Sequence, residues 1–293
     1  MLLRSATFLF ATFITLVMPN DSDAYKILAV FGHPGKSHFR FYAPYLEKLA
    51  AKGHQVLTIS HFHRKHSVAN YTDIDLLETS SIRTVKTMSL DGLDNFNQIT
   101  AALTLRKWGA EACKKTLEHP EVQKIIKSND TFDLLVTETF STDCYLTFAH
   151  QFKIPSIAFS PCALMPWVPD KVGHVDNPSY TPNHFSESTD HMDFGERVIN
   201  TLSVVFHKFF YCFFMAVPVH RIASNHFGDN LPTMSDLGRN TSMIFVNSHF
   251  SLSRPRPLVP GVIEVAGLHI KEGNKLSKFL FVLAVGTRKG WKS

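Results

Sequence analysis

Short uninterrupted runs of apolar residues alternate along the chain with longer stretches of helical periodicity. The first run, Lys26–Phe31, ends at Gly32 and predicts a buried strand. Residues 39–52 carry apolar side chains three and four positions apart, which predicts a helix, and Gly53 follows where a C-terminal cap belongs. A second strand is predicted over residues 55–59. Together these segments predict one βαβ unit with a right-handed crossover.

The same alternation continues through the rest of the chain. Further strands are predicted over residues 132–137, 154–160, 242–247 and 262–266, and helices over residues 97–128 with a break at Pro120, 143–152 and 193–217. Strands that alternate with helices predict an α/β fold with a Rossmann-like parallel sheet. Ligands bind such sheets at the carboxyl ends of the strands. The candidate loops at that edge are therefore residues 32–38, 138–143 and 160–169.

The composition is that of a folded protein with a sizeable core, because 44% of the 293 residues are hydrophobic and 19% are charged. The net charge of +5 is spread along the chain without a basic block, so nucleic-acid binding is not predicted. Gly35-Lys36-Ser37 suggests a phosphate loop, but position 30 is Val where that motif requires Gly. No Gly-x-Gly-x-x-Gly or Cys-x-x-Cys pattern occurs either. We therefore expect neither a bound cofactor nor a metal.

Residues 1–24 have the pattern of a secretory signal peptide. Arg4 supplies the positive start, residues 6–18 form an uncharged apolar run, and Ser22 and Ala24 are small residues at the cleavage positions. The apolar run is too short to cross a bilayer, which favours a cleaved signal over an anchor. The mature chain is then expected to begin at residue 25 in the secretory pathway.

Asparagine and cysteine residues can be chemically modified in that compartment. Three asparagines stand in glycosylation acceptor motifs, namely Asn70, Asn129 and Asn240. The chain has four cysteines, at positions 113, 144, 162 and 212, and an oxidising lumen allows them to pair. Four cysteines do not make a disulfide framework in a chain of this length, so we expect most of them to be buried free thiols.

His38 is the candidate catalytic residue, because it lies at the start of the first predicted helix, at the ligand-binding edge of the sheet. An imidazole can act as a general base near neutral pH. It then requires an acidic partner that fixes its tautomer, and both Glu138 and Asp143 follow the strand predicted over residues 132–137. A surface histidine near a helix start is the structural alternative.

A series of motifs in fixed order is more specific. Residues 26–39 read KILAVFGHPGKSHF, and the later motifs are FDLLVTE at 132–138, SPCALMPW at 160–167, NPSY at 177–180, FGER at 194–197 and PLVPGVIEVAGLH at 257–269. With these motifs the sequence resembles the UDP-glycosyltransferases of the secretory pathway, particularly the insect branch. The resemblance covers about residues 26–270.

The resemblance implies the GT-B architecture, in which an N-terminal Rossmann-like domain binds the acceptor and a C-terminal one binds UDP-sugar. It implies that His38 deprotonates an acceptor hydroxyl, which displaces UDP from the sugar with inversion. The family usually has Asp at the position of Glu138, and Asp143 remains the alternative partner. Five residues match acceptor-binding positions by the same resemblance: Ser37, Phe39, Phe140, Pro161 and Trp167.

The family's C-terminal half has no counterpart in this sequence. We expect a signal peptide at 1–24, the acceptor-binding domain at 25–270 and a divergent tail at 271–293. One interpretation is a truncated UDP-glycosyltransferase that transfers a hexosyl or glucuronosyl group to small lipophilic hydroxylated acceptors. The other is an inactive acceptor-binding or regulatory fragment. UDP-sugar is a co-substrate only if a donor domain is supplied, which makes oligomers with itself or with full-length members relevant.

Residues 198–219 are rich in phenylalanine and other large apolar residues. His207 and Lys208 interrupt the run, so a transmembrane helix is not predicted. A core helix or the wall of a lipophilic pocket is one interpretation, and a monotopic membrane contact is the other. The expected location is the lumen of the endoplasmic reticulum, with secretion as the alternative.

Overall fold

The computed structural model describes residues 24–64, 66–77, 97–253 and 255–270. The predicted signal peptide, except its last residue, and the predicted tail at 271–293 lie outside the described residues.

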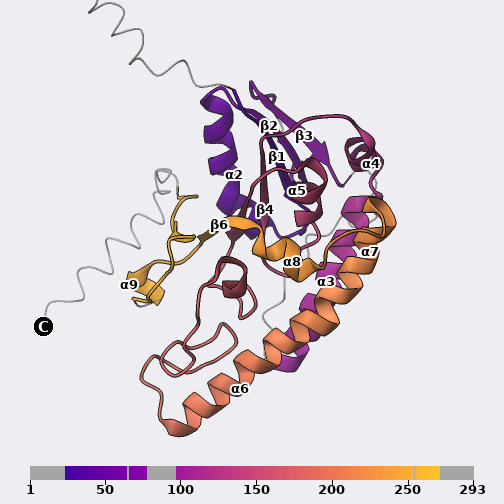
Figure 1. Cartoon of the computed structure of the whole chain (residues 1–293). Coiled ribbons are helices and arrows are strands. Elements are labelled where there is room, and N and C mark those ends of the chain that lie inside the picture. The colour runs from indigo at the N-terminus through magenta and orange to yellow at the C-terminus, as the bar shows by residue number, and fades with distance from the viewer. Residues whose placement is uncertain (1–23, 65, 78–96, 254, 271–293) are drawn as a thin grey trace, which may run out of the picture.

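The described chain is built around a parallel sheet of seven strands (Figure 1). In spatial order these are β3 Tyr71–Asp75, β2 Gln55–Ser60, β1 Lys26–Phe31, β4 Leu134–Glu138, β5 Ser156–Ser160, β6 Thr241–Val246 and β7 Val262–Glu264. The order reverses between β1 and β4, which makes their carboxyl ends the switch point where ligands bind in such folds. The Rossmann-like α/β prediction is confirmed. The loops predicted at the ligand edge follow β1, β4 and β5, which are neighbours in the sheet.

Helices cover both faces of the sheet (Figure 1). They are α2 Lys36–Ala51, α3 Gln98–Glu118, α4 Pro120–Lys127, α5 Leu146–Phe152, α6 Phe194–Phe210, the π-helical segment η3 Tyr211–Ala216, α7 Val217–Phe227, α8 Met234–Arg239, α9 Phe250–Ser253 and the 3₁₀ turn η2 Pro169–Val172. The α2 helix lies on one face, and α3, α5 and α7 lie on the other.

The first strand shows why its apolar run is uninterrupted. Ile27, Ala29 and Phe31 belong to the core cluster under α2, whereas Leu28 and Val30 belong to the cluster under α3, α5 and α7. Successive side chains of a strand point to opposite faces, and both faces of this one are covered by helices. The strand therefore carries no polar residue between its first position and the site loop.

The structure differs from the predicted elements at an edge strand, in the extent of the long helix, and at the short elements η2, α8 and α9, which were not predicted. The edge strand β3 reads Tyr-Thr-Asp-Ile-Asp. It was not predicted, because three of its five residues are polar and it forms no continuous apolar run. The helix predicted over 193–217 begins at Phe194, where Asp193 caps it and pairs with Glu196 in its first turn, and it continues through η3 to Phe227.

The combined helix α6–η3–α7 carries an exposed apolar face. Its members include Phe194, Ile199, Leu202, Val205, Phe209 and Phe213. Among the described residues this is the one helix long and apolar enough to cross a membrane by length and composition, and 44% of its most apolar window is buried. A core helix of a soluble protein passes the same test. His207 and Lys208 interrupt the apolar run in the sequence, but the helix still meets the criteria of length and composition.

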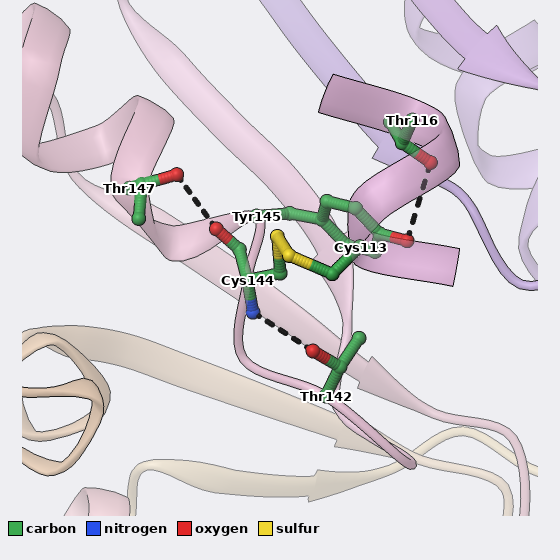
Figure 2. The surroundings of a disulfide bond; sticks show 6 residues. All are labelled: Cys113, Thr116, Thr142, Cys144, Tyr145 and Thr147. Atoms are coloured by element: carbon green, nitrogen blue, oxygen red, sulfur yellow. Dashed lines mark hydrogen bonds between the residues drawn. A yellow bond between two sulfur atoms is a disulfide. The ribbon is translucent and has the colours of Figure 1, made fainter. Parts of the chain in front are cut away.

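A disulfide bond joins Cys113 of α3 to Cys144 in the segment that follows β4 (Figure 2). Gly109, one turn earlier in α3, lies against the same segment, where an added Cβ would stand 2.1 Å from the Ser141 carbonyl oxygen. This close approach brings the two cysteines together. The expectation that most cysteines are buried free thiols is wrong: the two free ones are half-buried Cys162 and exposed Cys212.

Removal of this disulfide is expected to destabilise the domain strongly. Replacing Cys113 and Cys144 by alanine should lower the free energy of unfolding by about 2–4 kcal/mol, because the unfolded chain loses a cross-link across a sequence separation of 31 residues. Urea unfolding with and without dithiothreitol measures this. Replacing Cys162 and Cys212 is the matched control and should change little. Insensitivity of the wild-type chain to reductant would contradict the pairing.

Candidate active site

His38 and Glu138 meet at the switch point of the sheet. His38 lies in the first turn of α2, which follows β1, and Glu138 is the last residue of β4, the neighbour of β1 in the sheet, so residues separated by 100 positions come together. The His38 Nδ1 atom lies 2.5 Å from Glu138 Oε1. Because the carboxylate holds Nδ1, the Nε2 atom is the one left for a substrate.

Glu138 is buried, with 3% of its side chain exposed, while 19% of the His38 side chain is exposed. Burial alone would raise the pKa of the Glu138 carboxyl, but the adjacent His38, together with His33 and Tyr42, holds it below its ordinary value. Burial and Glu138 itself raise the pKa of Tyr42 well above its usual range, so this hydroxyl stays protonated. It donates to Glu138 Oε2 at 3.4 Å. The carboxylate is thus ionised and able to stabilise an imidazolium.

Aromatic rings fix the orientation of His38. His33, from the loop after β1, stacks on it with ring centroids 4.6 Å apart, and Phe140 packs edge-on at 4.7 Å. Burial lowers the pKa of His33 to about 4, so this neighbour is neutral at pH 7. The imidazole is therefore held on one side by a neutral ring and at one nitrogen by a carboxylate.

Asp143, the alternative partner, is engaged elsewhere. It is buried and forms short contacts with the Lys171 ammonium and the Tyr211 hydroxyl. Lys171 also donates to Thr139 Oγ1 at 2.5 Å. The structure therefore brings Glu138 beside His38 and assigns Asp143 to a separate buried network.

The remaining predicted site residues are distributed between the site and the core. Phe140 contacts His38, Ser37 is exposed at the start of α2 and Pro161 is half-buried after β5. Phe39 packs in the core against Phe31 and Phe62, and Trp167 is buried in a stack on Tyr211 with centroids 5.0 Å apart. For Phe39 and Trp167 the environment is thus that of core residues.

Several residues near the site were not predicted. His33 belongs to the loop after β1. Its position in that loop could have identified it as a site residue from the sequence. His61 follows β2, and Trp108 lies on α3; both line a cavity beside this loop. Their approach to the site depends on how α3 packs, which no local pattern reveals.

The three predicted glycosylation sites, Asn70, Asn129 and Asn240, are all exposed, as glycosylation requires. In the described part of the chain, no group of three or more His, Cys, Asp or Glu side chains is arranged to hold a metal ion.

Acidification is expected to destabilise the fold between about pH 6.5 and 4. Burial lowers the pKa values of His33, His61 and His207, so the unfolded chain binds more protons than the folded chain as pH falls through this window. The free energy of unfolding should fall by up to about 1.4 kcal/mol per pH unit for each such proton.

Urea unfolding at pH 7.5, 6 and 5 measures this effect. Glu138 contributes the same sign only at lower pH, because its folded pKa lies below its ordinary value. A His33→Gln variant should show a shallower pH dependence. Constant stability from pH 7.5 to 5 would contradict neutral burial of these histidines.

The model of the UDP-glucuronosyl and UDP-glucosyl transferase family matches residues 37–288. That match extends past residue 270, where we expect the tail to begin. UDP-glycosyltransferase UGT5 of Dactylopius coccus is 33% identical over 273 residues, covering 90% of this chain and 51% of that protein. UDP-glucosyltransferase 2 of the same insect is 31% identical, covering 89% of this chain and 50% of that protein. The chain thus spans about half the length of these relatives.

Rat UDP-glucuronosyltransferase 1A8 is 30% identical over 166 residues, covering 57% of this chain and 31% of that protein. Among solved structures, Medicago truncatula UGT71G1 complexed with UDP-glucose aligns with a TM-score of 0.41 and 13% identity, over 93% of this chain and 58% of that one. TcCGT1 in complex with UDP aligns with a TM-score of 0.42 and 12% identity, over 90% and 55% respectively.

Proposed function

The chain belongs to the UDP-glucuronosyl and UDP-glucosyl transferase family, and from this premise we propose that it is the acceptor-binding half of a GT-B sugar transferase. The reaction is inverting transfer of a hexosyl or glucuronosyl group to a hydroxyl of a small lipophilic acceptor. One observation carries the proposal: the His38–Glu138 pair at the carboxyl ends of β1 and β4.

His38 acts as the general base in this mechanism. Its Nε2 takes the proton of the acceptor hydroxyl while the hydroxyl oxygen attacks the anomeric carbon of the sugar. The new carbon–oxygen bond forms as the bond to the UDP oxygen breaks, and attack from the opposite side inverts the anomeric centre. Glu138 stabilises the imidazolium that results, because it is ionised and lies 2.5 Å from Nδ1.

UDP-sugar is expected to bind the half of the family that this sequence does not cover. Transfer requires the sugar to be held in line with the acceptor hydroxyl. By itself, the described site supports a second function, namely acceptor binding without transfer, alone or beside a full-length family member.

A fusion distinguishes these two functions. Residues 25–270 are joined to the C-terminal half of the Dactylopius coccus UGT5 relative, and transfer from labelled UDP-glucose and UDP-glucuronic acid to a panel of phenols is measured. The unfused chain and the relative's half alone are the controls. Transfer by the fusion but by neither control supports the role of an acceptor half. Transfer by the unfused chain supports a donor site that the chain recruits by association. A folded fusion that binds phenols but transfers nothing contradicts the transferase role.

We also propose that the protein occupies the lumen of the endoplasmic reticulum or is secreted. The disulfide between Cys113 and Cys144 suits an oxidising compartment, and the three glycosylation motifs are exposed. The gel mobility of the expressed chain before and after glycosidase treatment tests this. An unmodified intracellular chain would contradict it.

The exposed apolar face of α6 and η3 supports a monotopic membrane contact, with self-association as the alternative. Its side chains, among them Ile199, Leu202 and Phe209, lie at helical spacing on one surface. Flotation with liposomes tests the contact, and sedimentation of the unbound chain tests association. Replacing Leu202 and Phe209 by serine should reduce whichever occurs.

A further inference from the structure

The connection between β4 and α5, residues 139–145, is buried and carries one part of the site; we call it the β4–α5 segment. It follows Glu138 and includes Phe140, which packs edge-on against His38. Except for half-buried Phe140, every residue of this segment is buried. Connections between elements normally run over the surface, so a buried one must be held by contacts with the rest of the fold.

One face of α3 holds the β4–α5 segment. Gly109 of α3 lies against Ser141, where an added Cβ would stand 2.1 Å from the Ser141 carbonyl oxygen. One turn later, Cys113 is joined to Cys144 by the disulfide bond (Figure 2). The Cys144 carbonyl also accepts a hydrogen bond from the Thr147 hydroxyl at 2.6 Å. Helix and segment therefore touch at the backbone and are joined covalently one turn away.

The loop after β1 reaches the same contact. Thr116, three positions after Cys113 on the same face of α3, has its hydroxyl oxygen 3.4 Å from that of Tyr145. An added Cβ on Gly32 would stand 2.0 Å from the Tyr145 hydroxyl oxygen and 2.1 Å from that of Thr116. Gly32 begins the loop that leads into α2 and His38. The same helix face thus contacts both segments that supply the site.

We propose that the Cys113–Cys144 disulfide positions the catalytic pair: by fixing the β4–α5 segment on α3, it keeps Glu138 within reach of the His38 Nδ1 atom. The two cysteines are positioning residues, because they act through Glu138 and not on a substrate. Calling the pair catalytic rests on the proposed function. The effect of the disulfide on the contact between Glu138 and His38 does not.

This positioning determines the tautomer of His38. The ionised Glu138 carboxylate accepts a hydrogen bond from Nδ1, so Nδ1 carries the hydrogen and Nε2 keeps its lone pair. If Glu138 moves away, that preference is lost and the ring also populates the form with the hydrogen on Nε2. That form has no lone pair for the proton of an acceptor hydroxyl. A loosened segment therefore leaves a fraction of the molecules without a base at Nε2.

The ¹⁵N chemical shifts of the His38 ring nitrogens measure the tautomer directly. They are recorded on the ¹⁵N-labelled purified chain at about pH 8, and the His38 signals are those missing from His38→Ala. The wild-type chain should show one tautomer, with the hydrogen on Nδ1. Replacing Cys113 and Cys144 by alanine should give a mixture of both. In the fusion, this variant should show a kcat lower by about 10- to 10²-fold per folded enzyme, the scale of a displacement near 1 Å, with KM changed less.

Three further variants separate positioning from stability. Gly109→Ala displaces the Ser141 backbone with the disulfide intact, so it should also give both tautomers. Gly195→Ala in α6 is the matched glycine control, because its added Cβ makes only an ordinary contact at 3.4 Å. Ile27→Ala is the stability control, because it truncates a buried side chain at the opposite, amino end of β1. Both controls should keep the single tautomer and, per folded enzyme, the wild-type kcat.

The tautomer and the transfer activity give separate answers. A mixture of tautomers in the chain without the disulfide, absent from both controls, supports the positioning role even if the fusion transfers no sugar. A mixture in the wild-type chain, a single tautomer without the disulfide, or an equal mixture in Ile27→Ala would overturn it. An active fusion whose kcat is unchanged without the disulfide overturns it as well and leaves the transferase function standing. If the chain without the disulfide does not fold, Gly109→Ala and Tyr145→Phe, which removes only the hydroxyl next to Thr116 and Gly32, decide by the same criteria.

Discussion

Replacing His38 by alanine is expected to lower the turnover of the fusion enzyme by about 10²- to 10⁴-fold, the range for loss of a general base. His38 is the imidazole at the β1–β4 edge with one nitrogen held by Glu138 and the other left for a substrate. Without it, the acceptor hydroxyl must attack while still protonated. The measurement is kcat with a phenol acceptor under saturating UDP-sugar.

Two controls show whether the loss of turnover arises in the chemical step and not from unfolding or weaker acceptor binding. His38→Ala leaves the buried Glu138 carboxylate without its His38 contact, so some loss of stability is expected, and kcat is therefore expressed per folded enzyme as determined by thermal unfolding. Phenol affinity should also change little, because the acceptor is held mainly by other walls. A His38→Ala fusion that retains wild-type kcat would remove this residue from the mechanism.

The sequence was sufficient to predict the scaffold of this site. Lys26–Phe31 is apolar on both faces and ends at a glycine, which identified a buried parallel strand and the loop after it. Because the carboxyl ends of parallel strands share one edge, the loops after residues 31, 138 and 160 could be grouped before any contact was known. His38 stands at the end of the first of these loops, which also contains His33 and Lys36.

The partners of that histidine were harder to predict, for a physical reason. Glu138 and Asp143 lie five residues apart in one segment, and both carboxylates are buried. The choice depends on Lys171 and Tyr211, which reach Asp143 from distant elements and leave Glu138 to His38. The spacing of residues along the sequence does not show which of the two carboxylates Lys171 and Tyr211 will contact.

The disulfide and the cavity lined by Trp108 were missed for a related reason. Cys113, Trp108 and Gly109 lie on one helix whose sequence shows only amphipathic spacing. Their roles arise where that helix meets the segment after β4 and the loop after β1. These are contacts between elements, and the cysteine count alone could not select one pairing.

The two carboxylates should respond to neutralisation in opposite ways. Glu138→Gln in the fusion is expected to lower kcat by about 10²-fold or more, because an amide cannot stabilise the imidazolium and can hold the wrong tautomer of His38. Asp143→Asn should leave the kcat of the folded fraction near wild type. It should instead lower the free energy of unfolding by about 3–5 kcal/mol, because the Lys171 ammonium remains buried without its counter-charge.

Urea unfolding and kcat, measured on the same preparations at one temperature, test both halves of this expectation. The matched control is Asp143→Asn combined with Lys171→Met, which removes the stranded charge and should recover part of the stability. If instead Asp143→Asn lowers kcat while Glu138→Gln does not, Asp143 is the functional partner and the His38–Glu138 contact is structural. Since one segment carries both carboxylates, a segment-wide distortion would lower both quantities in both variants, whereas separate roles predict that each variant changes one.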